Sequence, residues 1–252
     1  MNHTRRPDRL RAHLAREAAR LMYEEGVKQY LDAKRMAARR LLGRRDARAT
    51  RYRPHDLPSN GEIRDALIEL AALVEGHERM DRLFAMRVVA LEVMDALEPF
   101  TPGLIGSVST GAVRRGSDID LHVFTDAPDA LEQHLFDLGW YFDTEVVAIW
   151  KDGAPRDFLH VHIAHTFPIE LSVLPTRERR LVGRSSTDGK PIVRLKTTAL
   201  RALIAQDHPA AWAAWQQTGE LADLDRFEAE GQVLTLADAE ALVEELDAPT
   251  PW

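Results

Sequence analysis

Two carboxylates at alternate positions are the part of the chain best suited to chemistry. Asp118 and Asp120 flank Ile119, and mostly apolar residues continue to Phe124. Side chains alternate in an extended strand, so both aspartates should project from one face and the apolar residues from the other. Adjacent carboxylates repel each other unless a cation lies between them, and such oxygen ligands suit Mg²⁺. The pattern therefore predicts a magnesium site of the kind that supports phosphoryl or nucleotidyl transfer.

A glycine-serine pair precedes these aspartates and could hold phosphate. Gly106 lies twelve residues before Asp118 and follows a short apolar segment. A glycine lets the backbone approach a ligand closely because it has no Cβ. Residues 107–113 are expected to form a short helix whose first N–H groups face an anion. Arg114 and Arg115 would add positive charge beside it.

These motifs resemble those of a known enzyme superfamily. The Gly106-Ser107 pair, Gly111 and the Ser-Asp-Ile-Asp run are similar in type and spacing to the polymerase-β-like nucleotidyltransferases. That superfamily includes DNA polymerases, poly(A) and CCA-adding enzymes, aminoglycoside nucleotidyltransferases and toxin-antitoxin nucleotidyltransferases. The resemblance covers roughly residues 104–175, under a third of the chain. Thr110 departs from the pattern, since several relatives carry a phosphate-binding arginine there, and Arg114 or Arg115 is expected to take that task.

The resemblance implies a third carboxylate on a later strand. Glu170 lies in the alternating run 167–174, which is typical of a half-buried strand, and Glu145 on a preceding strand is the alternative. The resemblance further implies two Mg²⁺ or Mn²⁺ ions, an NTP substrate and release of pyrophosphate. In that scheme Asp118 and Asp120 bind both metals, and Glu170 binds the catalytic one and helps to deprotonate the attacking hydroxyl. The implied nucleotide-binding residues are Gly106, Ser107, Arg115 and Ser117.

The histidines near this run admit two interpretations. His160 and His162 should share one face of a strand, where paired imidazoles can bind Zn²⁺ or Mn²⁺, although a merely polar strand face is favoured. His122 should share a face with the aspartates and lie near the site without being a ligand. A catalytically silent domain with the same fold is a separate alternative, although the presence of all three acidic residues argues against it.

Composition narrows the class of protein. The chain has 252 residues and no cysteine, which excludes disulfides, thiolate metal sites and cysteine nucleophiles. No apolar run approaches the roughly 20 residues that a membrane span requires, and the arginine-rich start lacks a signal-peptide core. We therefore expect a cytoplasmic protein with no membrane partner.

Charge is distributed unevenly along the chain. Residues 1–54 hold 16 Lys and Arg against 6 Asp and Glu, a net charge of +10, so the total of −7 leaves −17 for residues 55–252. Arginine suits phosphate contacts and base stacking, and a one-sided basic segment is typical of a nucleic-acid contact. The equal alternative is a basic helical arm that docks on the protein's own acidic residues.

Hydrophobic periodicity predicts helices on both sides of the strands. Helices are expected over residues 9–22, 27–42, 59–74, 79–97, 128–138, 192–205, after 207, and over 236–246, and strands over 119–124, 140–150, 158–165 and 167–174. Gly43 is expected to end a helix, and residues 44–58 to form a linker or extended arm. The expected domains are a basic helical extension (1–58), a nucleotidyltransferase core (59–182) and a helical C-terminal part (183–252).

The sequence thus predicts an α+β nucleotidyltransferase fold, with a small mixed β-sheet flanked by N- and C-terminal helices. The expected activity is metal-dependent transfer of an NMP from an NTP such as ATP to a hydroxyl, with RNA, at its 3′ end, as the acceptor. Adenylyl transfer to a small molecule or to a protein hydroxyl is the alternative activity, and a silent nucleotide- or RNA-binding module is the alternative from another class.

Overall fold

The computed structural model describes residues 6–49, 57–151, 154–185, 187–221 and 227. These residues divide into two compact units, one within Met1–Arg79 and Val182–Ile192, the other within Met80–Leu181 and Val193–Trp252. This division falls after residues 79, 181 and 192, and the expected domain boundaries after residues 58 and 182 stay predictions. We call the first the helical unit and the second the sheet unit.

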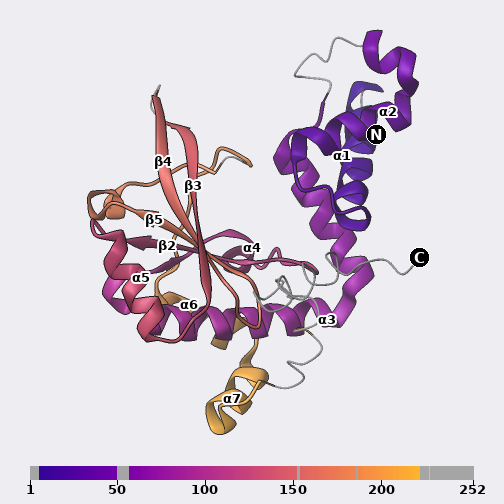
Figure 1. Cartoon of the computed structure of the whole chain (residues 1–252). Helices are drawn as coiled ribbons and strands as arrows, with labels where there is room; N and C mark the ends of the chain where they lie inside the picture. The colour runs from indigo at the N-terminus through magenta and orange to yellow at the C-terminus, as the bar shows by residue number, and fades with distance from the viewer. Residues whose placement is uncertain (1–5, 50–56, 152–153, 186, 222–226, 228–252) are drawn as a thin grey trace, which may run out of the picture. The chain divides into compact units, whose positions relative to one another are not determined.

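The helical unit contains α1 (Arg6–Glu24), α2 (Tyr30–Ala49) and the first part of α3 (Asn60–Ala96) (Figure 1). Leucines and alanines at helical spacing form its core, which includes Leu14, Ala18, Ala33 and Ile63. The small alanines let α1 and α2 pack closely, so the periodicity in these segments predicted the helices correctly.

Glycines interrupt both α2 and α3. Gly43 has φ 75° and ψ 164°, and Gly76 has φ 53° and ψ −125°, so the helical backbone breaks at each. The helix end expected at Gly43 is therefore confirmed. The linker expected over residues 44–58 is wrong at its start, because residues 44–49 form a further helical segment; residues 50–56 lie outside the described residues.

A five-stranded mixed sheet forms the centre of the sheet unit, in the order β1-β2-β5-β4-β3 (Figure 1). Its strands are β1 (Gly103–Leu104), β2 (Ile119–Phe124), β3 (Phe142–Lys151), β4 (Ala154–Ile163) and β5 (Ile169–Leu174). The β2 and β5 strands are parallel, and all other neighbours are antiparallel. The α+β class with a small mixed sheet and flanking helices is thus confirmed.

One face of this sheet is apolar and packed. Ile119, Leu121 and Val123 of β2 are fully buried in a core that also includes residues of α3, α5 (Pro128–Asp137) and α6 (Thr197–Asp207). The opposite face carries Asp120 and the side chains that alternate with that core. The remaining elements are η1 (Glu98–Phe100), α4 (Gly106–Thr110), η2 (Thr176–Arg180) and α7 (Pro209–Thr218).

The helix expected from residue 192 begins only at Thr197. Leu195 instead pairs with Leu104 of β1, through bonds of 2.9 Å and 2.8 Å in the two directions. The short strand β1 lies at the edge of the sheet, and its backbone hydrogen bonds with Leu195 therefore hold these residues in an extended conformation. The helix expected over residues 236–246 lies outside the described residues.

No helix among the described residues combines the length and apolar character needed to cross a membrane.

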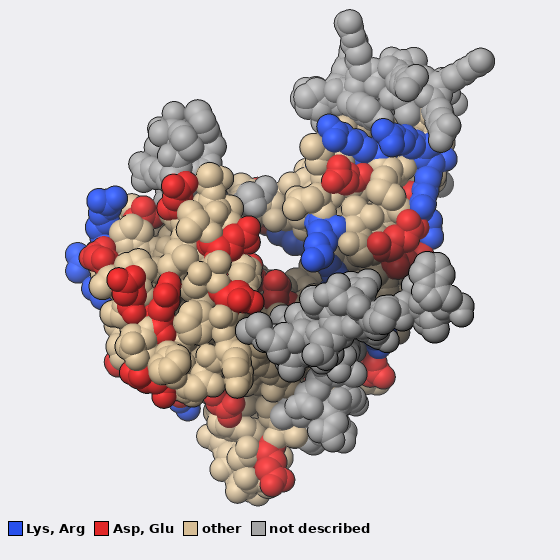
Figure 2. All heavy atoms as spheres, in the orientation of Figure 1, with Lys and Arg blue, Asp and Glu red and all other residues tan. Residues whose placement is uncertain are grey.

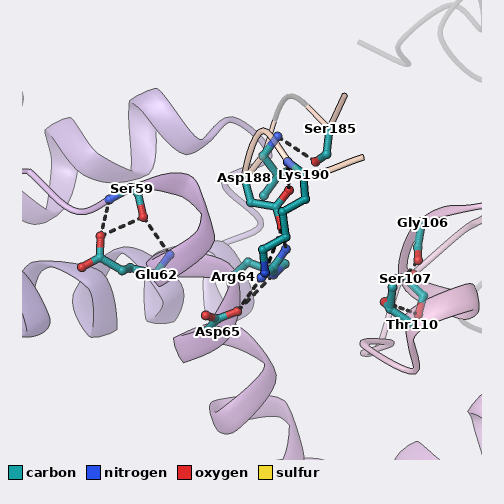
Figure 3. A network of polar contacts seen from close by, with 11 residues as sticks. Ser59, Glu62, Arg64, Asp65, Gly106, Ser107, Thr110, Ser185, Asp188 and Lys190 are labelled. Atoms are coloured by element: carbon teal, nitrogen blue, oxygen red, sulfur yellow. Dashed lines mark hydrogen bonds and ion pairs between the residues drawn. The ribbon is translucent and has the colours of Figure 1, made fainter. Parts of the chain in front are cut away.

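The start of α3 has a capping box, and its removal should lower the stability of the helical unit. Ser59 Oγ accepts from the Glu62 N–H (3.1 Å), and Glu62 accepts from the Ser59 N–H (2.7 Å) (Figure 3). Arg11 also donates to Glu62 and, as the main cause, lowers the pKa of Glu62 to about 2. We expect Ser59→Ala to destabilise the helical unit by about 1 kcal/mol, measured by urea unfolding followed by circular dichroism. Thr198→Ala, an exposed change on α6, is the control, and an equal effect of both variants would contradict the prediction.

Candidate functional site

Three carboxylates converge on one face of the sheet. Asp120 of β2 and Glu170 of β5 are direct partners in the parallel register, so their side chains project together. Asp118 lies immediately before β2, and oxygens of Asp118, Asp120 and Glu170 all lie within 4.8 Å of one another. The structure therefore brings together the three acidic residues that the sequence singled out. Their spacing suits oxygen ligands around a divalent cation.

Burial and mutual repulsion disfavour the charged forms of the carboxylates in this triad. Burial, followed by the nearby charges of Asp118 and Glu170, raises the pKa of Asp120 to about 8. Loss of water also raises the pKa of Asp118, with repulsion from Glu170 as a second cause, although the residue reaches the surface. Such desolvated like charges favour a bound proton or a bound cation.

Gly106 is packed against Asp120, and no larger residue would fit. It has φ 70°, and a Cβ built there would lie 1.9 Å from Asp120 Oδ2. The backbone is fixed at the same place, because the Ile105 N–H donates to the Asp120 carbonyl oxygen (3.0 Å). The glycine expected to approach a ligand thus first allows the turn to approach a carboxylate.

The turn after Gly106 forms the short helix α4. Ser109 Oγ donates to the Gly106 carbonyl oxygen (2.8 Å). Thr110 Oγ1 donates to the carbonyl oxygens of Gly106 and Ser107 (3.2 Å each) (Figure 3). Thr110, which departs from the superfamily pattern, therefore stabilises the helix end. The Ser107 hydroxyl has no hydrogen bond to any described residue, and this half-buried side chain lies at the first turn of α4.

The loop from α4 to β2 places the other expected nucleotide-binding residues. Ser117 Oγ accepts from the Arg114 N–H (3.0 Å), so this serine shapes the turn that leads to Asp118. Arg114 donates to the Arg115 carbonyl oxygen (3.0 Å), and Arg115 itself is exposed. The hydrogen bond of Ser117 thus stabilises the turn, and the phosphate-binding role expected for Arg115 stays a prediction.

His160 contacts the triad directly, whereas Glu145 lies apart from it. His160 Nδ1 lies 2.6 Å from Glu170 Oε1, a distance at which an Nδ1–H donates to the carboxylate. The two strands β4 and β3 are antiparallel, and Glu145 of β3 is the partner of His160, two strands away from β5. His162 Nε2 lies 3.8 Å from Glu145 Oε2. Glu170 rather than Glu145 therefore completes the cluster. Of the two histidines, His160 contacts Glu170 and His162 lies near Glu145.

A buried arginine, which sequence reasoning missed, supports α4 from the core. Arg87 of α3 is only 2 % exposed, its Nε donates to the Val108 carbonyl oxygen (3.2 Å), and its Nη1 pairs with Asp207 (2.7 Å). Its position, three residues after Phe84 and four before Leu91, is on the apolar stripe of the helix, but a charged side chain there is not expected to be buried without partners. Arg87 ties α3, α4 and the end of α6 together behind the turn.

A second arginine that sequence reasoning missed lies on the carboxylate face of the sheet. Arg194 Nε donates to His122 Nδ1 (2.9 Å), and its guanidinium lies 5.0 Å from the centre of the Phe124 ring. His122 thus lies on the same face as Asp120 and accepts from an arginine on Nδ1, and the expectation that it is not a metal ligand stays a prediction. Only the extended backbone at residues 193–195, which the sequence predicted to be helical, makes this contact possible.

Much of the basic charge described in the helical unit is paired within that unit. Arg11 pairs with Glu62 (2.6 Å), and Arg40 pairs with Glu25 (2.8 Å) and Glu17 (3.3 Å). Figure 2 shows basic side chains beside acidic ones over this unit. These pairs favour the docking interpretation for these arginines, and the side chains of residues 44–53, the densest part of the arginine run, lie outside the described residues.

Gly106→Ala tests the close packing of the turn. A methyl group cannot occupy a position 1.9 Å from Asp120 Oδ2, and the positive φ adds strain, so the turn or the carboxylate must move. We expect cation-induced stabilisation by Mg²⁺ or Mn²⁺, measured as a rise in Tm, to be lost. Gly116→Ala is the matched control, because Gly116 also has a positive φ but a Cβ there would meet no atom within 4 Å. Equal cation responses of the two variants would contradict this assignment.

The raised pKa of Asp120 predicts how stability depends on pH. Between about pH 4 and pH 8 the folded, metal-free protein binds a proton that the unfolded chain has lost, so its stability falls as pH rises through this window. We expect Asp120→Asn to be more stable than wild type at pH 8.5 in chelator, by on the order of 1–5 kcal/mol, and similar to it at pH 4.

Adding Mg²⁺ or Mn²⁺ at pH 8.5 should stabilise wild type and not the Asp120→Asn variant. Urea unfolding with and without the cation measures both effects. A wild-type stability that rises between pH 4 and pH 8 relative to Asp120→Asn would show that the charges are not confined as described.

Comparisons of this chain with protein-family models, with curated proteins and with solved structures found no match.

Proposed function

We propose that this protein is a metal-dependent nucleotidyltransferase that moves an NMP from an NTP to a hydroxyl. The observation that carries the proposal is the convergence of Asp118, Asp120 and Glu170 within 4.8 Å, beside a glycine turn packed on Asp120. The order of strand, turn and second strand is the one expected from the superfamily resemblance. A metal site alone has many uses, but a phosphate-holding turn next to it favours nucleotidyl transfer.

The donor set suits Mg²⁺ or Mn²⁺, and the superfamily resemblance implies two such ions. All three groups offer carboxylate oxygens, and these hard ligands suit both cations. Burial is the first cause of the raised pKa of Asp120 and the charges of Asp118 and Glu170 are the second, and a divalent cation would relieve that repulsion. When bound, the ions would supply charge stabilisation for the attacking and leaving oxygens of an in-line displacement.

The residues of the chain divide the remaining tasks. In this proposal the first amides of α4 and the Ser107 hydroxyl hold the phosphates that leave as pyrophosphate, with Arg115 as a further contact. Glu170 takes the proton of the attacking hydroxyl, and the hydrogen bond from His160 to Oε1 keeps that carboxylate in place. The acceptor oxygen then bonds to the α-phosphorus as the bond to the pyrophosphate oxygen breaks.

We propose RNA, at its 3′ end, as the acceptor. The support is the net charge of +10 in residues 1–54. The ion pairs of Arg20 and Arg40 use glutamates that this sum already counts, whereas the pair of Arg11 with Glu62 offsets one charge. Arg39 of α2, for example, is exposed and has no ion pair with a described residue. Transfer to a small molecule or a protein hydroxyl is the competing outcome of the test.

The test is a labelling assay with matched carboxylate variants. Wild type, incubated with each of the four α-labelled NTPs, Mg²⁺ or Mn²⁺ and total RNA, is expected to label the RNA. Glu170→Gln should lower the rate by about 100-fold or more, because it removes both a cation ligand and the base. Glu145→Gln is the control, an exposed strand glutamate outside the cluster, and should remain within about twofold of wild type.

Other outcomes of the assay are informative. Label on protein or on an added aminoglycoside would replace RNA as the acceptor. Binding of NTP without any transfer, unchanged in an Asp118→Ala and Asp120→Ala double variant, would identify a silent binding module. Equal losses in Glu170→Gln and Glu145→Gln would refute the assignment of the base.

A further inference from the structure

Arg194 lies beside the strand that carries Asp120, held by several contacts within the sheet unit. Its Nε donates to His122, and its Nη1 donates to the carbonyl oxygens of Leu181 (2.8 Å) and Arg179 (3.3 Å). Its guanidinium stacks at 5.0 Å on Phe124. Since His122 and Phe124 alternate on the same face of β2 as Asp120, the arginine lies directly beyond the acidic triad on that face.

The chain makes room for this arginine with a glycine. Gly103 of β1 is the direct partner of His122, and a Cβ there would lie 3.0 Å from Arg194 Cβ. The neighbouring pair of Leu104 and Leu195 holds the segment extended, so that the Arg194 side chain crosses β1 to reach β2. The backbone pairing of Leu104 with Leu195 and the stacking on Phe124 therefore together fix the position of the guanidinium.

The hydrogen bonds of Arg194 to described residues use Nε and Nη1, so that Nη2 can donate to a ligand. A guanidinium has five N–H donors, of which Nε uses one and Nη1 directs its pair at two carbonyl oxygens. Nη2 lies on the same edge of the planar group as Nε, the edge that faces His122, and has no hydrogen bond to a described residue. Arginine stays charged when partly buried, and two N–H donors in a fixed plane suit the oxygens of a phosphate.

We propose that Arg194 binds a phosphate group of the acceptor, so that the acceptor is a phosphate-bearing nucleoside, either a free nucleotide or the end of an RNA chain. This inference rests on the proposed function. In an in-line displacement the attacking and leaving oxygens lie on opposite sides of the phosphorus. In the proposed function the α4 turn beside Asp120 holds the leaving phosphates. Arg194 instead contacts β2 further along, at His122 and Phe124, so we assign it to the acceptor.

The first test measures binding and needs no turnover. With Ca²⁺ and saturating α,β-methylene-ATP to occupy the donor position, AMP and adenosine are titrated into wild type by calorimetry. Wild type should bind AMP at least about tenfold more tightly than adenosine, and Arg194→Gln should remove that difference. Arg194→Lys should restore part of it, and Arg180→Gln, which removes an exposed arginine of η2, should retain all of it.

The second test uses turnover to separate acceptor from donor. Arg194→Gln should raise the KM for a phosphate-bearing acceptor by about 10- to 100-fold and leave the KM for the NTP within about twofold. A rise in the KM for the NTP alone would place Arg194 on the donor and overturn the proposal. Cation-induced stabilisation, measured as a Tm shift, checks that the variant keeps the triad, and Arg194→Lys carries the test if Arg194→Gln does not fold.

The two hypotheses fail in different ways. If wild type transfers no label to any acceptor, the proposed function fails, and the AMP and adenosine titrations still decide whether Arg194 holds a phosphate. If wild type is an active transferase that binds AMP and adenosine equally, the proposed function stands and the role of Arg194 is refuted.

Discussion

The repulsion between confined carboxylates is the constraint on which the site depends. Asp118, Asp120 and Glu170 lie within 4.8 Å of one another on a face where water is partly excluded, and Asp120 is reluctant to ionise there. Packing of the opposite, apolar face of β2 holds this arrangement in spite of its cost. A divalent cation bound between these carboxylates would remove their repulsion and would therefore increase the stability of the folded state.

The surroundings of the triad are arranged around that constraint. Gly106 lets the turn pack on Asp120, His160 fixes one oxygen of Glu170, and Arg87 holds α4 from behind. Each of these contacts joins two different elements, so the turn and both strands are positioned as one assembly. Arg194 extends the same face with positive charge beyond the carboxylates. The charge on this face of β2 therefore changes from acidic at Asp120 to basic beside His122 and Phe124.

Local patterns revealed most of this fold, and long-range pairing limited the rest. The bounds of β2 and the alternation that marks Glu170 follow from period-two patterning, and the capping box at Ser59 marks the start of α3. The choice of Glu170 over Glu145 required the strand order, which no local pattern encodes. Arg194 escaped prediction because residues 192–196 have a helical pattern, whereas Leu104 offers them backbone hydrogen bonds that a sequence does not display. Arg87 escaped because burial of a charge depends on partners as distant as Asp207.

The parallel pairing of β2 with β5 has a consequence for how the protein assembles. About fifty residues separate the two strands, so their alignment forms late compared with the local hairpin of β3 and β4. A slip of one residue in β5 would turn Glu170 into the apolar layer and bring Ile169 or Leu171 to the solvent side. Burying that carboxylate would be prohibitively unfavourable, so misaligned chains are rejected by the same residues that the aligned chain needs for chemistry. The acidic cluster therefore disfavours misaligned pairing of β2 with β5 during folding.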